Sequence, residues 1–306
     1  MSNKVKSIII KINKLSININ NEITVLLILY QEENNQVLQN LEKIKNFKII
    51  IIDNSNNIEL QNIIKNKYNI YKYIINKENI GFAKAANIGI NLVNTKYIIF
   101  SQGDCPMSEE NIFSLFEAYK KYKDCFLITP TFINENMEIS YNAGPFPEKK
   151  IDNDTIHLEG DICAEGISTA IILFKKEDIL NIGLFNENFF IYFMDYDLCR
   201  RIRNIKKSAI QTNDVKIKHV HGNLKVKNIY KKIFSRNYNF SYDELIYFYN
   251  INKYESKFNK LKKKLPKYIF KAIINLFFLK FSKSVYYFAL ICAYYNFNKF
   301  LKKNSQ

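Results

Sequence analysis

Apolar runs of strand length alternate with more polar, helix-compatible segments through the first half of the chain. The segments between the runs repeat their apolar residues at helical spacing, most clearly over 81–93. Strands are predicted at 23–30, 47–55, 71–79, 96–104 and 125–133, with helices between them. Strands that are apolar throughout are covered on both faces, so the pattern predicts an α/β fold around a mostly parallel sheet.

The alternation becomes less regular after residue 133. The expected elements are a loop-rich stretch over 134–160, a strand and short helix over 168–183, an aromatic loop and helix over 184–205, and a strand over 208–222. The helix within 184–205 carries Asp195 and Asp197 in its first turn, and the last strand ends in His219 and His221. If that strand is regular, both histidines point to one face.

Two of the predicted strands end in an aspartate, Asp53 and Asp104. Because ligands bind outside the carboxyl ends of parallel strands, both carboxylates are expected on the same rim of the sheet. Asp104 stands in YIIFSQGDCP, where Gln102 and Gly103 occupy positions at which a second acid could lie. The stretch therefore raises the question of whether a single carboxylate can serve a site for metal and phosphate.

Net charge is +16, but almost all of it lies in the last part of the chain. Residues 225–306 hold 18 Lys and Arg against 3 Asp and Glu, which leaves 27 basic and 26 acidic residues in 1–224. The chain is therefore divided into an N-terminal extension (1–21), an α/β domain (22–228) and a basic, aromatic helical region (229–306).

Two interpretations of the helical region remain open. Its longest uncharged run, Ser284–Asn298, has 15 residues, which is short of the roughly 17–25 that span a bilayer. A basic helix pair with an apolar face could lie on an anionic membrane surface. The same helices could instead close the core of the main domain, and amphipathicity does not separate these two interpretations.

The remaining composition excludes several classes of protein. Five scattered cysteines without a CxxC pair fit reduced thiols rather than a disulfide framework or a zinc site. The first apolar run is broken by Lys11, unlike a secretory signal. A cytoplasmic location, peripheral on the inner face of the membrane if the basic region binds lipid, is therefore expected. No nucleic-acid-binding motif accompanies the charge, so no nucleic-acid partner is predicted.

Six segments in order resemble the inverting family 2 glycosyltransferases, and most closely the bacterial rhamnosyltransferase-type members. They are IIIIDNSNN (49–57), NIGFAKAANIGI (79–90), FSQGDC (100–105), GISTAIILFKKED (166–178), GLFNENFFIYFMDYDLCRRIR (183–203) and HVHG (219–222). The resemblance implies the Rossmann-like GT-A fold of nucleotide-diphospho-sugar transferases. It also implies transfer of a sugar, from a donor such as dTDP-rhamnose or a UDP-sugar, to a saccharide or lipid-linked acceptor of bacterial surface polysaccharide.

The resemblance also assigns the donor site. Asp53 would accept a hydrogen bond from the nucleotide base, although Asp-Asn-Ser is also ordinary turn chemistry. The segment with Asn79, Gly81, Phe82 and Asn87 would lie against the nucleotide-sugar. Gly81 permits a tight turn into a helix whose first amides favour phosphate, while Asn87 could equally shape the helix.

Asp195 is expected to be the catalytic base that takes the proton of the acceptor hydroxyl. The family usually has a pair of acids here, and this chain has Met194 in the first position. Asp197 fits a helix-dipole role, and Asp195 could also be only a stabilising first-turn charge. Arg200 or Arg201 could neutralise the diphosphate, although Arg201 could equally lie on a solvated face.

The resemblance implies Mg²⁺ or Mn²⁺ at the diphosphate, and such ions need only one or two protein carboxylates. Asp104 corresponds to the last acid of the family's metal motif, and Gly103 would leave room for a sugar or ribose. His219 is the candidate second ligand, although a strand histidine is often structural. Leu224 replaces a polar residue common in the family, which weakens any phosphate contact there. The missing acids favour an alternative, a non-catalytic sugar-nucleotide-binding subunit of the same fold.

Overall fold

The computed structural model describes residues 19–139, 143–149, 159–219 and 228–304. The chain divides into two compact units, which are treated separately below. The α/β unit holds the described residues of 1–80, 84–185 and 198–224, and the helical unit holds those of 81–83, 186–197 and 225–306. His221 and Leu224 lie outside the described residues.

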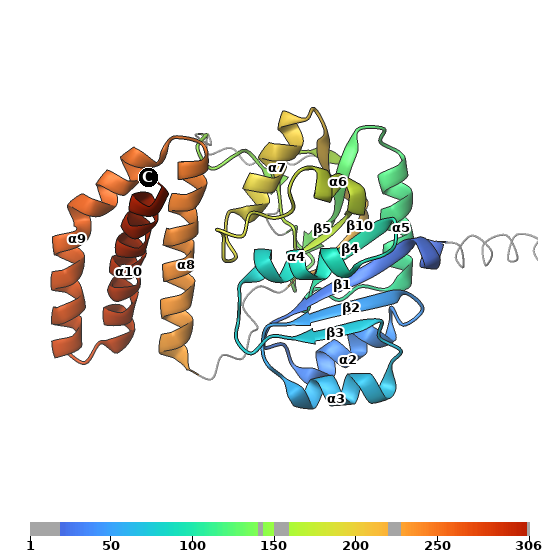
Figure 1. Cartoon of the computed structure of the whole chain (residues 1–306), viewed down its shortest axis with the longest axis horizontal. Helices are drawn as coiled ribbons and strands as arrows, with labels where there is room; N and C mark the ends of the chain where they lie inside the picture. Colours follow the sequence, from blue (N-terminus) through green and yellow to red (C-terminus); the bar gives the residue numbers. More distant parts are fainter. Residues whose placement is uncertain (1–18, 140–142, 150–158, 220–227, 305–306) are drawn as a thin grey trace, which may run out of the picture. The chain divides into compact units, whose positions relative to one another are not determined.

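The first half of the α/β unit alternates strands and helices as the apolar pattern predicts (Figure 1). Its elements are β1 (Ile23–Leu29), α2 (Asn34–Glu42), β2 (Lys48–Asp53), α3 (Ile58–Lys67), β3 (Lys72–Ile75), α4 (Phe82–Leu92), β4 (Tyr97–Gln102), α5 (Glu109–Lys120) and β5 (Cys125–Ile133). The start of α5 is fixed by a capping box, in which Ser108 and Asn111 each bind the other's backbone amide.

The second half adds shorter elements. They are β6 (Ala143–Gly144), β7 (Ile162–Cys163), β8 (Gly166–Ile167), β9 (Ile171–Lys175), α6 (Lys176–Asn181), α7 (Met194–Asn204) and β10 (Ser208–Lys218). The strand, short helix and stop predicted over 168–183 are confirmed as β9, α6 and Gly183, whose φ of +87° suits glycine at a helix end.

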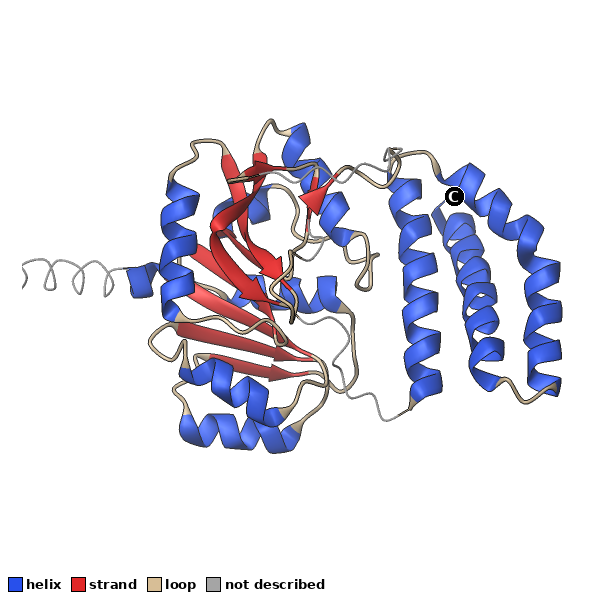
Figure 2. Cartoon of the chain, turned by 180° about the vertical axis from the view of Figure 1, so that it is seen from behind, coloured by secondary structure: helices blue, strands red, loops and turns tan. Residues whose placement is uncertain are grey.

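Among the described residues, eight strands form one sheet in the order β3-β2-β1-β4-β9-β5-β10-β7. The strands are drawn in red in Figure 2. The strands β3, β2, β1 and β4 are mutually parallel, whereas β9 runs antiparallel to both β4 and β5. The predicted mostly parallel mixed sheet is therefore confirmed. Helix α4 lies close to β1, because a Cβ on Gly89 would come within 2.3 Å of Leu26.

The helical unit consists of α8 (Ile229–Asn250), α9 (Tyr254–Phe277) and α10 (Phe281–Asn304), together with the short segments 81–83 and 186–197. Helix α10 packs against both α8 and α9, with Phe258 of α9 stacked on Tyr294 of α10. None of the residues of α9 is buried. Among the described helices, none has both the length and the apolar character that crossing a membrane requires.

Candidate functional site

The carboxyl ends of β1, β2 and β4 meet at one edge of the sheet. Leu29 pairs with Asp53, and Ile28 pairs with Gln102, two residues before Asp104. Asp53 and Asp104 therefore follow neighbouring strands on the same rim, as the strand pattern predicts.

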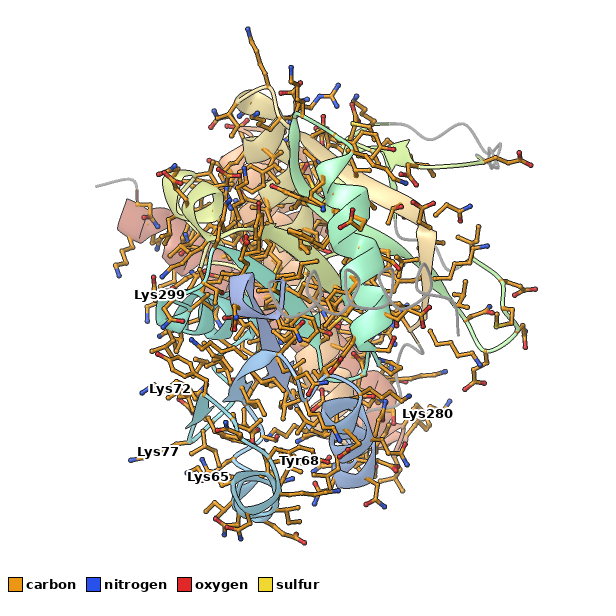
Figure 3. All side chains as sticks on the ribbon, turned by 90° about the vertical axis from the view of Figure 1, so that its right-hand side faces the viewer. Lys65, Tyr68, Lys72, Lys77, Lys280 and Lys299 are labelled. Atoms are coloured by element: carbon orange, nitrogen blue, oxygen red, sulfur yellow. The ribbon has the colours of Figure 1, made fainter. Side chains whose placement is uncertain are left out.

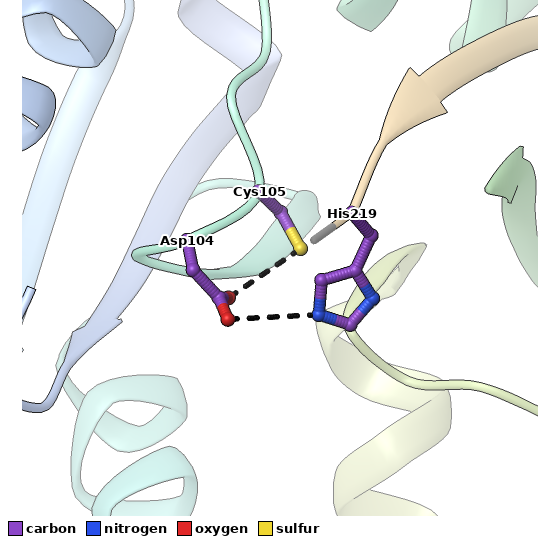
Figure 4. Close-up of side chains that lie close together, drawn as sticks. All are labelled: Asp104, Cys105 and His219. Atoms are coloured by element: carbon purple, nitrogen blue, oxygen red, sulfur yellow. Dashed lines mark hydrogen bonds and ion pairs between the residues drawn. The ribbon is translucent and has the colours of Figure 1, made fainter. Parts of the chain in front are cut away.

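Asp104 and His219 come together in the α/β unit from distant parts of the sequence (Figure 4). The Nε2 atom of His219 lies 3.6 Å from Oδ2 of Asp104, and Sγ of Cys105 lies 3.7 Å from Oδ1 of Asp104. The His219 side chain is only 5% exposed. It follows β10 directly, where its amide donates to the carbonyl of Ile133 and its ring lies beside Phe132.

The donor atoms of Asp104, Cys105 and His219 all lie within 4.8 Å of one another, so they could surround one cation. A carboxylate and a neutral imidazole suit Mn²⁺, and a carboxylate with water suits Mg²⁺. Burial and the nearby Asp104 carboxylate raise the pKa of the Cys105 thiol well above its ordinary value. Sulfur is also a softer ligand than Mn²⁺ or Mg²⁺ prefers. The residues present therefore fit a hard divalent ion held by Asp104 and His219, with Cys105 as a neighbour.

A third acid, Glu32, lies at the same rim, and the sequence pattern did not reveal it. Its pKa is raised to about 8, mainly by burial and also by the negative charges of Asp104 and Asp53. Its side chain occupies the space above Gly103, where an added Cβ would lie 2.8 Å from Cδ of Glu32. Gly103 thus makes room for a carboxyl group of the protein itself. The available signal was its position, three residues after a buried strand.

Asp53 is fully buried, and its carboxylate accepts hydrogen bonds from nearby residues of the protein. Oδ1 accepts from the amide of Ser55 at 2.6 Å and from its hydroxyl, while Oδ2 accepts from the Tyr73 hydroxyl at 3.0 Å and the Asn57 amide at 3.3 Å. These contacts are the turn chemistry that the sequence offered as the alternative role. They hold the loop after β2 at the rim, and recognition of a nucleotide base by Asp53 stays a prediction.

The segment from Asn79 to Asn87 enters α4 through a tight turn. Gly81 has φ of +87°, and its missing side chain leaves room for Phe190, whose carbonyl oxygen would lie 2.9 Å from a Cβ. That carbonyl accepts from the Phe82 amide at 2.6 Å. Within the α/β unit, the Asn87 side chain bridges both backbone groups of Phe185. Asn87 therefore fixes the start of the aromatic loop, which is the structural role considered for it, while Asn79 lies half-buried before the turn.

Asp195 lies in the first turn of α7 and is half-buried. Phe193 precedes the helix in the left-handed conformation, with φ of +60°. Its ring packs on Phe240 and Tyr247 of α8, at centroid distances of 5.2 and 5.8 Å. Asp197 is nearly buried and accepts a weak hydrogen bond from Asn250 at 3.4 Å, in keeping with the structural role predicted for it.

A buried acid of α8, Asp243, fixes the aromatic loop that leads into Asp195. Its carboxylate accepts from the amides of Phe190, Ile191 and Tyr192 at 2.8 to 3.2 Å. Asp243 has no exposed surface. Without this carboxylate, three successive backbone donors would lose their acceptor, which is costly. The sequence signal was slight, because Asp243 is one of three acids after Lys225.

We expect Asp243→Ala to destabilise the helical unit by about 3 kcal/mol, because three amides lose their acceptor. Thermal and urea unfolding followed by circular dichroism measures this. The neighbouring Glu244→Ala removes only a partly exposed ion pair with Lys257 and should cost less than about 1 kcal/mol. Equal losses from both substitutions would contradict the role of Asp243.

Asp243 also makes the stability of the folded chain depend on pH. Burial raises the pKa of Asp243 from about 3.8 to about 6 in the folded chain. The neutral carboxyl is favoured by folding, so its contribution to stability is complete below about pH 4 and is lost as pH rises through 6. Asp243→Asn should remove that part of the dependence.

Arg200 and Arg201, two of the three arginines of α7, already have protein partners. Arg200 forms an ion pair with Glu148, and its guanidinium lies 4.1 Å from the centre of the Phe146 ring. Arg201 donates to the carbonyl of Ile182 at 2.8 Å, just after α6. A diphosphate contact by Arg200 would have to compete with Glu148, and it stays a prediction.

The sheet order and the polar rim define an open α/β fold with a candidate ligand site at the carboxyl edge of its strands. Residues 21–176 match the model of the family described as glycosyl transferase family 2. That match covers about half of the chain, and the protein belongs to this family. Asp53 and Asp104 lie within the matched part, whereas Asp195 and His219 lie beyond it.

Solved structures agree on the fold. A structure of GalNAc-T7 with UDP, GalNAc and Mn²⁺ is similar at a TM-score of 0.53 and 13% identity, over 74% of this chain and 51% of that one. The mannosyltransferase PcManGT from Pyrobaculum calidifontis, in complex with GDP-Man and Mn²⁺, is similar at a TM-score of 0.51 and 10% identity, over 89% of this chain and 85% of that one. This chain thus spans about half of the GalNAc-T7 chain. A comparison with curated proteins finds no match.

Proposed function

We propose that the protein transfers a sugar from a nucleoside-diphosphate sugar to a hydroxyl of a saccharide or lipid-linked acceptor, with inversion at the anomeric carbon. The observation that carries this proposal is the approach of Asp104 and His219 at the carboxyl edge of the sheet, 3.6 Å apart. Open α/β sheets bind their ligands at this edge.

The donor class and the metal are supported by the two similar structures, which hold UDP with GalNAc or GDP-Man, each with Mn²⁺. We propose that Asp104 and His219 hold Mn²⁺ or Mg²⁺ beside the donor diphosphate. A bound divalent ion would neutralise charge that develops on the leaving diphosphate. Asp53 at the same rim, and the Asn79–Asn87 segment with Gly81 and Phe82, are proposed to lie toward the nucleotide.

Asp195 is proposed as the general base. The acceptor oxygen forms a bond to the anomeric carbon as the bond from that carbon to the diphosphate oxygen breaks. The acceptor proton passes to a carboxylate oxygen of Asp195, and the nucleoside diphosphate leaves with the electron pair. The three amides held by Asp243 fix the backbone just before this helix, which would limit the positions open to the base.

The proposed setting is the assembly of bacterial surface polysaccharide in the cytoplasm, with a rhamnose-type donor as the finer expectation from the sequence resemblance. A screen of dTDP-, UDP- and GDP-sugars tests donor class and metal together. We expect one donor to bind, to be slowly hydrolysed without acceptor, and to lose affinity in EDTA.

The screen also tests the alternative of a non-catalytic subunit. Donor binding without hydrolysis or transfer to any acceptor would favour that alternative. Equal affinity in EDTA and Mn²⁺ would contradict the metal site. Absence of binding to every nucleotide-sugar would contradict both functions.

A further inference from the structure

The turn between α9 and α10 exposes a cluster of large apolar side chains, which we call the apolar tip. The tip consists of Phe270, Ile273, Leu276, Phe277, Phe278 and Leu279, with exposed fractions of 65, 63, 54, 79, 60 and 71%. The turn lies at the end of the hairpin opposite the C-terminus of α10 (Figure 1). Exposed apolar surface gathered in this way marks an interaction site.

The internal packing of the helices does not account for the tip. Helix α10 buries Ala289, Ala293, Tyr294 and Phe297, which lie well beyond its first turn. Helix α9 buries nothing along its length. The four consecutive residues from Leu276 to Leu279 cannot all face one neighbouring helix, because successive residues point in different directions.

The charge around the tip has a single sign. From Ser256 to Gln306 the chain carries twelve lysines and no acidic residue. Lys267, Lys280 and Lys283 are exposed on either side of the turn, and Lys280 projects from the ribbon in Figure 3. The surface that covers the tip must therefore be both apolar and negatively charged.

We propose that the apolar tip inserts into the surface of an anionic phospholipid membrane, with the flanking lysines at the head groups. An amphipathic helix end of this composition lies in the interface between head groups and acyl chains. Each lysine near an anionic surface adds attraction that falls with salt. The inference goes beyond sugar transfer and does not depend on it.

A second copy of the chain is a poorer occupant of the tip. Pairing two tips would bring two lysine-rich segments without acids against each other, and like charges across an interface oppose association. A membrane rich in anionic lipid supplies both the apolar interior and the negative charge.

Vesicle co-sedimentation of the full chain tests this inference. The vesicles contain either phosphatidylcholine alone or an equimolar mixture with phosphatidylglycerol. We expect binding to the mixed vesicles that Phe277→Ser with Phe278→Ser weakens at least about tenfold. Lys280→Glu with Lys283→Glu should weaken it by a similar factor, and only on the mixed vesicles. The matched control is Tyr295→Ser, which changes an aromatic residue of α10 that is 53% exposed and should leave binding unchanged.

Several results would contradict membrane insertion of the apolar tip. If the wild-type chain stays in the supernatant with mixed vesicles, or if the double serine variant binds as well as wild type, the inference is wrong. If the wild-type chain forms a dimer that does not bind vesicles, and the serine substitutions dissociate that dimer, a second copy of the chain covers the tip. Circular dichroism of each variant confirms that the helices remain folded, and donor binding reports separately on the proposed function.

Discussion

The Asp195→Asn variant is expected to turn over its substrates about 10²- to 10⁴-fold more slowly than wild type, because a positioned general base contributes a factor of this size. Asparagine has nearly the same shape as aspartate but cannot take the acceptor proton. Donor affinity should be unchanged, since the base acts on the acceptor. Single-turnover transfer and donor titration measure the two effects independently.

Asp197→Asn provides the matched control for this substitution. Asp197 lies in the same turn of α7 but is nearly buried and accepts from Asn250. We expect it to retain most of the wild-type turnover. Near wild-type transfer by Asp195→Asn, or an equal loss in the two variants, would remove Asp195 from the proposed mechanism.

Asp104→Asn is expected to weaken Mn²⁺ binding at least about 100-fold, since a ligand should matter more than the outer-shell groups whose loss costs 10- to 100-fold. Electron paramagnetic resonance of free Mn²⁺, in the presence of UDP or GDP, measures the affinity. His219→Asn should also weaken binding. Together these two substitutions test whether one carboxylate and one imidazole form the site.

The Cys105→Ser variant tests whether Cys105 is a ligand of the metal or only lies beside it. The Cys105 thiol lies beside Asp104, but Mn²⁺ prefers oxygen and nitrogen ligands to sulfur, so replacement of Cys105 should leave Mn²⁺ affinity unchanged. If Cys105→Ser weakened binding as much as Asp104→Asn, the site would be of a softer kind. Full Mn²⁺ affinity in Asp104→Asn would place the metal elsewhere.

The fold follows from the sequence because its signals are local. Apolar runs predict β1, β2, β4 and β5 to within a few residues. The rim follows as well, because parallel strands share their carboxyl edge. The approach of His219 to Asp104 required the family resemblance, since no local pattern connects the two residues.

Long-range contacts explain what the sequence did not reveal. The pKa of Glu32 is raised by burial and by the negative charge of Asp104. Glu32 follows β1, whereas Asp104 follows β4. Gly103 was expected to make room for a sugar, yet its open side is filled by Leu29 and Glu32. Asp243 resembles any acid of an amphipathic helix until the loop from Phe190 to Tyr192 is folded against it.

The hydrogen bonds of Asp243 also limit where the chain can be truncated without disturbing the loop before Asp195. The family match ends at residue 176, and a fragment ending near residue 228 would keep the sheet with Asp104. Such a fragment would lack the acceptor for the amides of the loop before Asp195. The C-terminal helices are therefore not an exchangeable module. Recombination that replaced them with helices from a relative would have to restore an acid at this position, or the inherited loop would lose its conformation.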